Sequence, residues 1–417
     1  MAHFCIPGRR CSALVCSTLL IFCSLRPSLA QDRSDLQLVE TLTFGMDRII
    51  GISVDEKAET IQRIYTQGSR RVVCYDARKN VIFKVMGAGR APCLSKNGNY
   101  LVAWAMQHGR SKAEPDRVRL EFRDRNGKLL SSDKPANLYE DPYIQVFPSN
   151  AGYFLKERSS SLSLCTPPDT TENTLLEWEG PRGEEPVFSC DVSFTGDPHV
   201  FFIALSSDHE SAMFLMNDRG DTLWRSPELP FKIFEPSVSP EGKNVCFQRW
   251  EYRPRMVHED TAKPIGTYIL ERGSRSPRRL ITTRTGMDCE FLGNRYLSLW
   301  SGDECIVYDL AGDTVALRVH AEMWCKFVAA GAFEGNMLVL LAAVNTEQKV
   351  IRTRGDRTMY SAYELHVLDP GTAKVISKTS LQTRPGSIEM ERLRLTSWGN
   401  TLFLILPSTV MVFKARL

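Results

Sequence analysis

The chain has 417 residues, of which 43% are hydrophobic and 24% are charged. Its 52 basic and 49 acidic residues give a net charge of +3, so bulk charge favours neither nucleic acid nor an anionic membrane surface as a partner. The length exceeds what a single hydrophobic core usually supports unless the architecture is repetitive. No Pro-rich or Ser-rich linker divides the chain.

Residues 1–30 contain the three parts of a secretory signal. Arg9 and Arg10 precede an apolar run over residues 11–25, and the small-x-small site Ser28-Leu29-Ala30 follows it. An apolar run of about fifteen residues is too short to cross a bilayer comfortably. The alternatives, a buried N-terminal helix and a twin-arginine export signal, fit these residues less well. We therefore expect cleavage after Ala30, a mature chain in the periplasm or outside the cell, and no membrane span.

Cleavage would remove Arg9, Arg10 and Arg26 and no acid, which leaves 49 basic residues against 49 acidic ones. Eight cysteines would remain, at positions 74, 93, 165, 190, 246, 289, 305 and 325. An even number permits disulfides in an exported protein, but the spacings form no Cys-x-x-Cys pair and no small disulfide framework. Most of them lie in apolar runs, where cysteine behaves as a small hydrophobe, so we expect mostly buried thiols.

The mature chain begins with an apolar segment at residues 36–44, and one phrase then recurs about seven times, which is the signature of a repeat architecture. The phrase is a small or hydroxyl residue, a polar turn with Gly or Asn, and an apolar run. It occupies residues 95–101, 193–196 and 239–245, and in looser form 149–154, 292–297, 333–338 and 397–402. Turn chemistry between two apolar runs predicts a β-hairpin.

A second phrase alternates with the first and also predicts a hairpin. An apolar strand ends at Asp or Asn, whose side chain caps a tight turn, and another apolar strand follows. This phrase occupies residues 75–83, 124–130, 217–224, 309–315 and 369–375. The first phrase would join strands a and b, and the second would join strands c and d. One pair of phrases would therefore complete a four-stranded sheet.

Strand a would begin near residues 48, 91, 143, 187, 234, 287, 325 and 391. This spacing predicts an all-β fold over residues 31–417, a single β-propeller domain of eight four-stranded blades, in which radial repetition leaves only short, protected edges. The last sheet runs out of chain near residue 413 with three strands, so we expect residues 36–44 to supply the fourth and close the ring. The first sheet has Asp55-Glu56-Lys57 in place of the first phrase, which leaves seven blades as the alternative.

Two of the repeats resemble those of known propeller families. The stretch Ser239-Pro240-Glu241-Gly242-Lys243 resembles the Ser-Pro-Asp-Gly-Lys repeat of TolB-type, WD40-like (PD40) propellers. Residues 220–224, Gly-Asp-Thr-Leu-Trp, resemble the Gly-x-x-x-Trp repeat of quinoprotein-like propellers. These motifs are short and are shared by families with unrelated functions. The resemblance therefore implies a fold and says little about activity.

The sequence contains no recognisable catalytic, metal or cofactor motif. It has no Gly-x-Ser-x-Gly elbow, and of the tryptophans that quinoprotein dehydrogenases carry only Trp224 is in position, with no adjacent Cys pair. The histidines lack metal-site spacings, and the cluster at residues 258–260 is typical of a solvated turn. Asp191, Asp288 and Glu290 lie on or beside a strands but are too few to establish a carboxylate site. We therefore expect no catalytic residue, no metal and no cofactor.

Three b–c connections, at residues 106–119, 249–268 and 345–360, are much longer than a hairpin needs. If the strands alternate in direction, all three emerge on one face, and long loops on a rigid scaffold commonly bind partners. They contain twelve basic and seven acidic residues, together with interface-type aromatic side chains. The partner-binding residues that we predict are Arg110, Trp250, Arg253, Arg255, Arg352, Arg354, Arg357 and Tyr360. The alternative is that these segments are only solvated insertions.

These features predict an exported, monomeric, non-enzymatic propeller that acts as a protein-interaction scaffold. The excess of basic residues on the b–c loops favours an acidic protein segment or an anionic glycan as the partner, and nothing favours nucleic acid. The alternative from another class is a propeller enzyme, such as a carbohydrate-active one, or a ligand sensor, with its site at the mouth of the central channel. A cluster of carboxylates on several a strands would distinguish this alternative.

Overall fold

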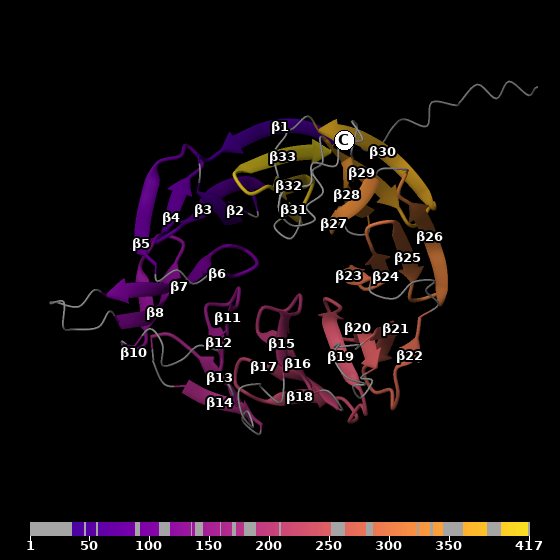
Figure 1. The fold of residues 1–417 in the computed structure, drawn as a ribbon, viewed down its shortest axis with the longest axis horizontal. Coiled ribbons are helices and arrows are strands. Elements are labelled where there is room, and N and C mark those ends of the chain that lie inside the picture. The colour runs from indigo at the N-terminus through magenta and orange to yellow at the C-terminus, as the bar shows by residue number, and fades with distance from the viewer. Residues whose placement is uncertain are drawn as a thin grey trace, which may run out of the picture.

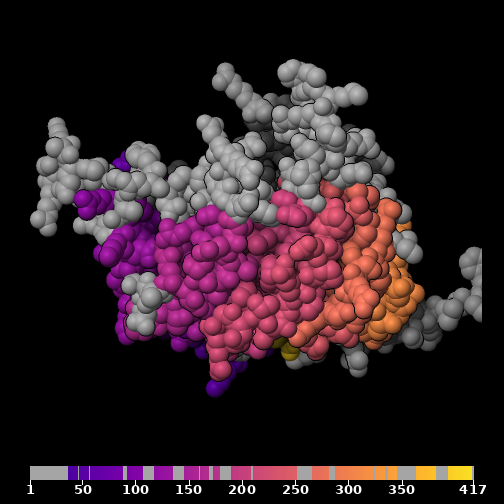
Figure 2. Space-filling view, turned by 90° about the horizontal axis from the view of Figure 1, so that it is seen from below, coloured from indigo at the N-terminus to yellow at the C-terminus, as the bar shows by residue number. Residues whose placement is uncertain are grey.

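The computed structural model describes residues 36–415 except 46, 56, 88–91, 108–116, 135, 138–144, 159, 169–171, 179–188, 208–209, 252–262, 281–286, 323–324, 334–336, 345–361 and 382–392. In these residues all helical or strand structure is β, and the strands form eight antiparallel sheets around a ring (Figure 1). Seen from the side, successive blades follow one another in chain order along the wall (Figure 2). The predicted eight-bladed propeller is confirmed, and the seven-bladed alternative is wrong.

Each blade has its first strand innermost and its last strand outermost (Figure 1). The strands of blades 1 to 4 are, in order, β2 (Arg48–Asp55), β3 (Thr60–Gly68), β4 (Arg71–Asp76) and β5 (Val81–Met86); β6 (Cys93–Leu94), β7 (Tyr100–Gln107), β8 (Arg117–Asp124) and β9 (Leu129–Ser132); β11 (Gln145–Pro148), β12 (Phe154–Glu157), β13 (Ser161–Cys165) and β14 (Glu172–Glu177); and β15 (Ser189–Phe194), β16 (Val200–Ser206), β17 (Ser211–Asn217) and β18 (Thr222–Arg225). Blade 2 also contains β10 (Ala136–Asn137), which pairs with β8.

The strands of blades 5 to 7 are β19 (Lys232–Val238), β20 (Asn244–Glu251), β21 (Lys263–Glu271) and β22 (Arg278–Arg279); β23 (Asp288–Leu292), β24 (Tyr296–Trp300), β25 (Glu304–Asp309) and β26 (Thr314–His320); and β27 (Cys325–Phe333), β28 (Met337–Val344), β29 (Ala362–Asp369) and β30 (Lys374–Leu381). Blade 8 consists of β31 (Arg394–Trp398), β32 (Thr401–Ile405), β33 (Thr409–Ala415) and β1 (Leu36–Thr43). The innermost strands begin close to the eight predicted positions.

Hydroxyl side chains of the first phrase close the a–b turns of blades 2 to 5. Ser95 Oγ accepts a hydrogen bond from the backbone N–H of Tyr100 at 3.0 Å, and Ser149, Thr195 and Ser239 act as acceptors in the corresponding turns. Blade 1 lacks the phrase, and there Asp55 Oδ1 accepts hydrogen bonds from the backbone N–H groups of Lys57 and Ala58. A carboxylate thus closes the same turn, which explains why blade 1 forms without the phrase.

The five c–d turns that contain the second phrase are closed by the predicted side chains. In each, a carboxylate or amide oxygen at the end of strand c accepts a hydrogen bond from a backbone N–H of the turn, at 2.8–3.0 Å. The acceptors are Asp76, Asp124, Asn217, Asp309 and Asp369. Because strands alternate in direction, the a–b and c–d turns share one face of the disc, which we call the turn face. The b–c and d–a connections share the other, the loop face.

Hydrogen bonds between neighbouring a–b turns tie the turn face together. For example, Gly196 N donates to the carbonyl oxygen of Pro240 at 2.8 Å, and Glu241 N donates to Asn294 Oδ1 at 3.2 Å. Hydrogen bonds made by the a–b turns or by the strands beside them join the other blade pairs from blade 7 through blade 8 to blade 4. These bonds fix the blades to one another on the turn face.

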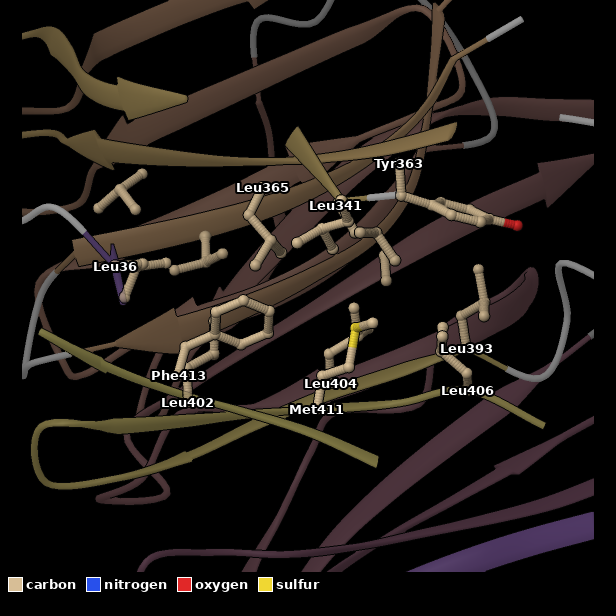
Figure 3. Close-up of a cluster of buried hydrophobic side chains, with 14 of the residues drawn as sticks. Leu36, Leu341, Tyr363, Leu365, Leu393, Leu402, Leu404, Leu406, Met411 and Phe413 are labelled. Atoms are coloured by element: carbon tan, nitrogen blue, oxygen red, sulfur yellow. The ribbon is translucent and has the colours of Figure 1, made fainter. Parts of the chain in front are cut away.

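Pairing of the two chain ends closes the ring, as predicted. β1 runs antiparallel to β33, from Leu36 opposite Ala415 to Thr43 opposite Thr409. The buried side chain of Leu36 joins the core between blades 7 and 8, where Phe413 faces Leu365 (Figure 3). Leu42, further along β1, is buried in the core between blades 8 and 1. The N-terminal strand therefore seals blade 8 on both of its faces.

The eight predicted thiols are all free cysteines, and five of them are buried. This agrees with the expectation that most of them pack as small hydrophobes. Within the described part of the chain, no helix has the length and hydropathy that a bilayer crossing requires.

Candidate functional site

The long b–c connections leave the same face, but two of them are shorter than predicted. They link β7 to β8, β20 to β21 and β28 to β29, while residues 108–116, 252–262 and 345–361 lie outside the described residues. The predicted loop boundaries at 106, 119, 249 and 268 are wrong, because backbone pairing continues further, for instance between Trp250 and Pro264. Seven predicted binding residues lie outside the described residues: Arg110, Arg253, Arg255, Arg352, Arg354, Arg357 and Tyr360.

Trp250, the one predicted binding residue that the structure describes, is a strand residue at the loop-face end of β20. Its ring packs on Phe234 with centroids 4.5 Å apart, and the Lys232 amine lies 5.1 Å from the Phe234 centroid. Next to it, the Arg249 guanidinium lies 4.4 Å from the centroid of Phe231. Cation–π and aromatic contacts of this kind hold both side chains in place. Trp250 is therefore part of the blade, at the edge of the face predicted to bind.

The central channel contains a cavity of about 750 Å³. Innermost strands of blades 1, 7 and 8 line it, together with the a–b turn of blade 2 and the edge of blade 6. Its apolar lining includes Ile50, Leu94, Val328, Leu395 and Trp398. Strand β27 contributes Ala329 and Ala330 to the lining, and these small side chains take up little of the space. The charged residues that line the cavity are Lys96, Asp288, Lys326 and Arg394.

Carboxylates follow one another along the inner part of blades 3 to 6. Glu157 ends β12, and Asp191, Glu235 and Asp288 lie on β15, β19 and β23. The negative charge of Asp191 acts on both Glu157 and Glu235, and a hydrogen bond joins the carboxyl groups of Glu235 and Asp288. Glu290 follows on β23. We call these five residues the carboxylate arc.

Burial raises the pKa of two members of the carboxylate arc into the neutral range. The pKa of Glu157 rises to about 7, first through burial and second through the charge of Asp191. The pKa of Glu290 also rises to about 7 through burial, which the Lys96 amine partly offsets. Loss of water raises the pKa of Glu235 and Asp288 too, and their mutual hydrogen bond favours the proton on Glu235. The arc is therefore partly protonated near neutral pH.

The structure adds Glu157 and Glu235 to the three carboxylates that the sequence places on or beside a strands, and of the five only Asp288 lines the cavity. Glu157 belongs to a b strand and approaches the inner strand only through its pairing with Gln145. Glu235 has a φ of 48° within an irregularity of β19, so strand alternation could not predict the side to which it points. The sequence did contain a signal for the carboxylate arc, since several successive a strands have an acidic residue near their start.

We expect the double substitution Glu157→Gln and Glu290→Gln to stabilise the protein at pH 8 and to have little effect at pH 5. A raised carboxyl pKa means that the folded state holds protons that the unfolded state releases. The stability due to these groups is complete below pH 4.5, the ordinary Glu value, and is lost as the pH rises through 7. Removing each ionisable group should raise the free energy of unfolding at pH 8 by about 1–3 kcal/mol. Urea unfolding at both pH values measures this.

The exposed Glu228 provides the matched control for that experiment. Its carboxylate forms an exposed ion pair with Arg225 at 3.3 Å, so Glu228→Gln should produce no gain at pH 8. Equal stabilisation of the double variant at pH 5 and pH 8 would show that ionisation is not the cause.

These features define the class of the protein as an eight-bladed β-propeller with a charged central channel. No protein-family model matches the chain, and no curated protein sequence matches it. Among solved structures, the C-terminal WD40 domain of Sif2 has a similar fold, with a TM-score of 0.54 and 11% identity over 91% of this chain and 98% of that one. Sqt1 from Chaetomium thermophilum, bound to the N-terminus of the ribosomal protein L10, also has a similar fold. Its TM-score is 0.51, with 14% identity over 91% of this chain and 100% of that one.

The dihydro-heme d1 dehydrogenase NirN also has a similar fold, with a TM-score of 0.50 and 14% identity over 81% of this chain and 67% of that one. The similar structures therefore include a complex with a protein segment and an enzyme. At such low identities the likeness shows the propeller fold alone, and function must be argued from the site.

Proposed function

We propose that this protein is an exported, non-enzymatic propeller that acts as a protein-interaction scaffold and binds its partner on the loop face. The observation that carries the proposal is the difference between the two faces. Hydrogen bonds between neighbouring a–b turns occupy the turn face. The loop face carries the three long connections and the charged end of the channel, where Lys326 and Arg394 begin their strands.

Several observations support the finer parts of this proposal. The signal-like residues 1–30 support export, followed by cleavage after Ala30. The excess of basic residues in the connections supports an acidic protein segment or an anionic glycan as the partner of a monomeric propeller. The Sqt1 propeller, which binds the N-terminus of a ribosomal protein, is a precedent for capture of a protein segment. The Ser239-Pro240-Glu241-Gly242-Lys243 turn supports a TolB-type repeat.

The carboxylate arc favours a second candidate, a ligand sensor or a carbohydrate-active enzyme with its site in the channel. Hydrolysis of a glycosidic bond requires two carboxyl groups about 5–9 Å apart, on either side of the bond. The Glu235 and Asp288 carboxyl groups are hydrogen-bonded to each other, which is closer than that separation. This pair is therefore better suited to binding a ligand than to hydrolysing a sugar, which makes sensing the stronger form of this alternative.

The scaffold proposal predicts that charge reversal on the loop face weakens capture of acidic polymers. The variant has glutamate in place of five arginines: Arg253, Arg255, Arg352, Arg354 and Arg357. Poly-L-glutamate and heparin serve as the acidic-peptide and anionic-glycan probes, and at low salt we expect at least a tenfold loss of affinity. Biosensor titrations at two ionic strengths measure it, and binding to the native protein should weaken as salt increases.

A matched control reverses five exposed cations of the turn face: Lys57, Arg78, Lys128, Arg219 and Lys374. It changes the net charge by the same amount, so retained binding of the probes would assign the attraction to the loop face. The proposal fails if the loop-face variant binds both probes like the native protein, or if the two variants lose binding equally.

A further inference from the structure

The cavity in the channel is asymmetric, and this asymmetry indicates a ligand. Its walls come from blades 7, 8, 1 and 2 and the edge of blade 6, and none of its lining residues belongs to blades 3, 4 or 5. A volume of about 750 Å³ lies within the range of small-molecule sites. Small residues on β27 create the space, and Gly331 lets β31 approach so closely that a Cβ there would lie 3.1 Å from Leu395 Cβ.

More than half of the cavity wall is apolar, and the described residues cover it only in part. Ile50, Leu94, Val328, Leu395 and Trp398 are partly exposed where they line it. Trp300, at the end of β24, adds a second indole from blade 6. An apolar ligand body gains free energy when it displaces water from the part of this aromatic and aliphatic lining that the described residues leave uncovered.

Two cations stand at the loop-face end of this apolar wall. Lys326 and Arg394 lie at the starts of the adjacent strands β27 and β31, and both side chains are exposed. The Arg394 guanidinium donates a hydrogen bond to the carbonyl oxygen of Ile50 at 3.2 Å, which holds it at the rim. Among the described residues, no carboxylate forms an ion pair with either cation. Asp288, the acidic residue of the lining, shares its hydrogen bond with Glu235 instead.

We propose that the cavity binds a small organic anion with an apolar body, whose carboxylate or sulfonate is held by Lys326 and Arg394 and whose apolar part contacts Val328, Leu395 and Trp398. Cationic donors pair with such anionic groups through charge-assisted hydrogen bonds. Three members of the carboxylate arc, Glu157, Asp191 and Glu235, lie in blades 3 to 5, across the channel from blades 7, 8 and 1. Their negative charge repels the anionic group and so favours its orientation toward Lys326 and Arg394. The ligand site extends the function beyond partner capture by the loops.

The anionic dye 8-anilino-1-naphthalenesulfonate tests the proposal, because Trp300 and Trp398 in the lining can transfer excitation to it. We expect saturable binding to the folded protein, with quenching of tryptophan emission. Decanoate should displace the dye. Decyltrimethylammonium, which has the same apolar chain and the opposite charge, should displace it at least tenfold less well, and acetate should not displace it. Equal displacement by the two decyl compounds would overturn the assignment of the charge.

The variant Lys326→Glu with Arg394→Glu should bind the dye at least tenfold more weakly than the native protein. Both side chains are exposed, so the fold should tolerate the change. The matched control reverses Arg219 and Lys374, two exposed cations of the turn face, and should bind the dye normally. Undiminished binding by the Lys326 and Arg394 variant would overturn the proposal. The loop-face variant with five reversed arginines should keep the dye site, so a failure here and a failure of the scaffold function are distinguishable.

Discussion

Deleting residues 31–45 is expected to make the propeller aggregate. The deletion removes β1 and exposes the whole edge of β33, whose backbone groups would then be free to pair with other chains. It also removes three buried side chains, Leu36, Leu42 and Phe44, from the cores on the two sides of blade 8. At about 1.5–3 kcal/mol for each, the loss is roughly 5–9 kcal/mol. That is comparable to the whole free energy of unfolding of an ordinary domain.

Light scattering and thermal unfolding of the protein with and without residues 31–45 measure this effect. The control keeps β1 and replaces its exposed residues Leu38 and Val39, 44% and 48% exposed, with Lys. That change should leave the melting temperature nearly unchanged, because it adds charge to an outer strand without touching either core. A shortened protein that remains monomeric with the melting temperature of the native chain would show that β1 does not close the ring.

The closure of the ring was predictable because it depends on counting strands. A three-strand remainder at one end and an unassigned strand at the other leave one pairing, and residues 36–43 occupy it in register with β33. The turns were predictable for a similar reason, since the side chains that close them are local. Ser95 reaches a backbone N–H five residues on, and Asp124 reaches one two residues on.

The channel was not predictable because its contacts lie between blades. Glu157 and Asp191 interact although they are 34 positions apart, and the outcome depends on where each b strand ends relative to its neighbour. The hollow beside β27 has the same origin. The sequence Val-Ala-Ala-Gly-Ala indicates small side chains. The blades opposite decide whether a larger residue fills the space beside them, and the sequence of β27 alone does not contain that information.

Replacing Gly98 with Ala is expected to destabilise the protein severely through a contact between two blades. Gly98 lies in the a–b turn of blade 2 with a φ of +66°, and a Cβ there would lie 2.0 Å from the carbonyl oxygen of Ile52 in β2. The left-handed backbone alone costs a side chain about 1–2 kcal/mol. Because the obstructing atom belongs to a backbone, relief requires blades 1 and 2 to move apart, and overpacking of this kind adds about 1–3 kcal/mol.

Gly273 separates these two contributions. Its φ is +93°, and a Cβ there would meet nothing within 4 Å, so Gly273→Ala introduces the backbone strain without the collision. Urea unfolding should therefore place Gly98→Ala below Gly273→Ala by the cost of the collision alone. The hydroxyl of Tyr65 also donates to the carbonyl oxygen of Gly98 at 2.9 Å, and displacement of the turn would break that bond and leave a buried hydroxyl without its acceptor. Equal losses of unfolding free energy in the two glycine variants would mean that blades 1 and 2 move apart without cost at this junction. The inference that the turn face holds the blades rigidly would then be wrong.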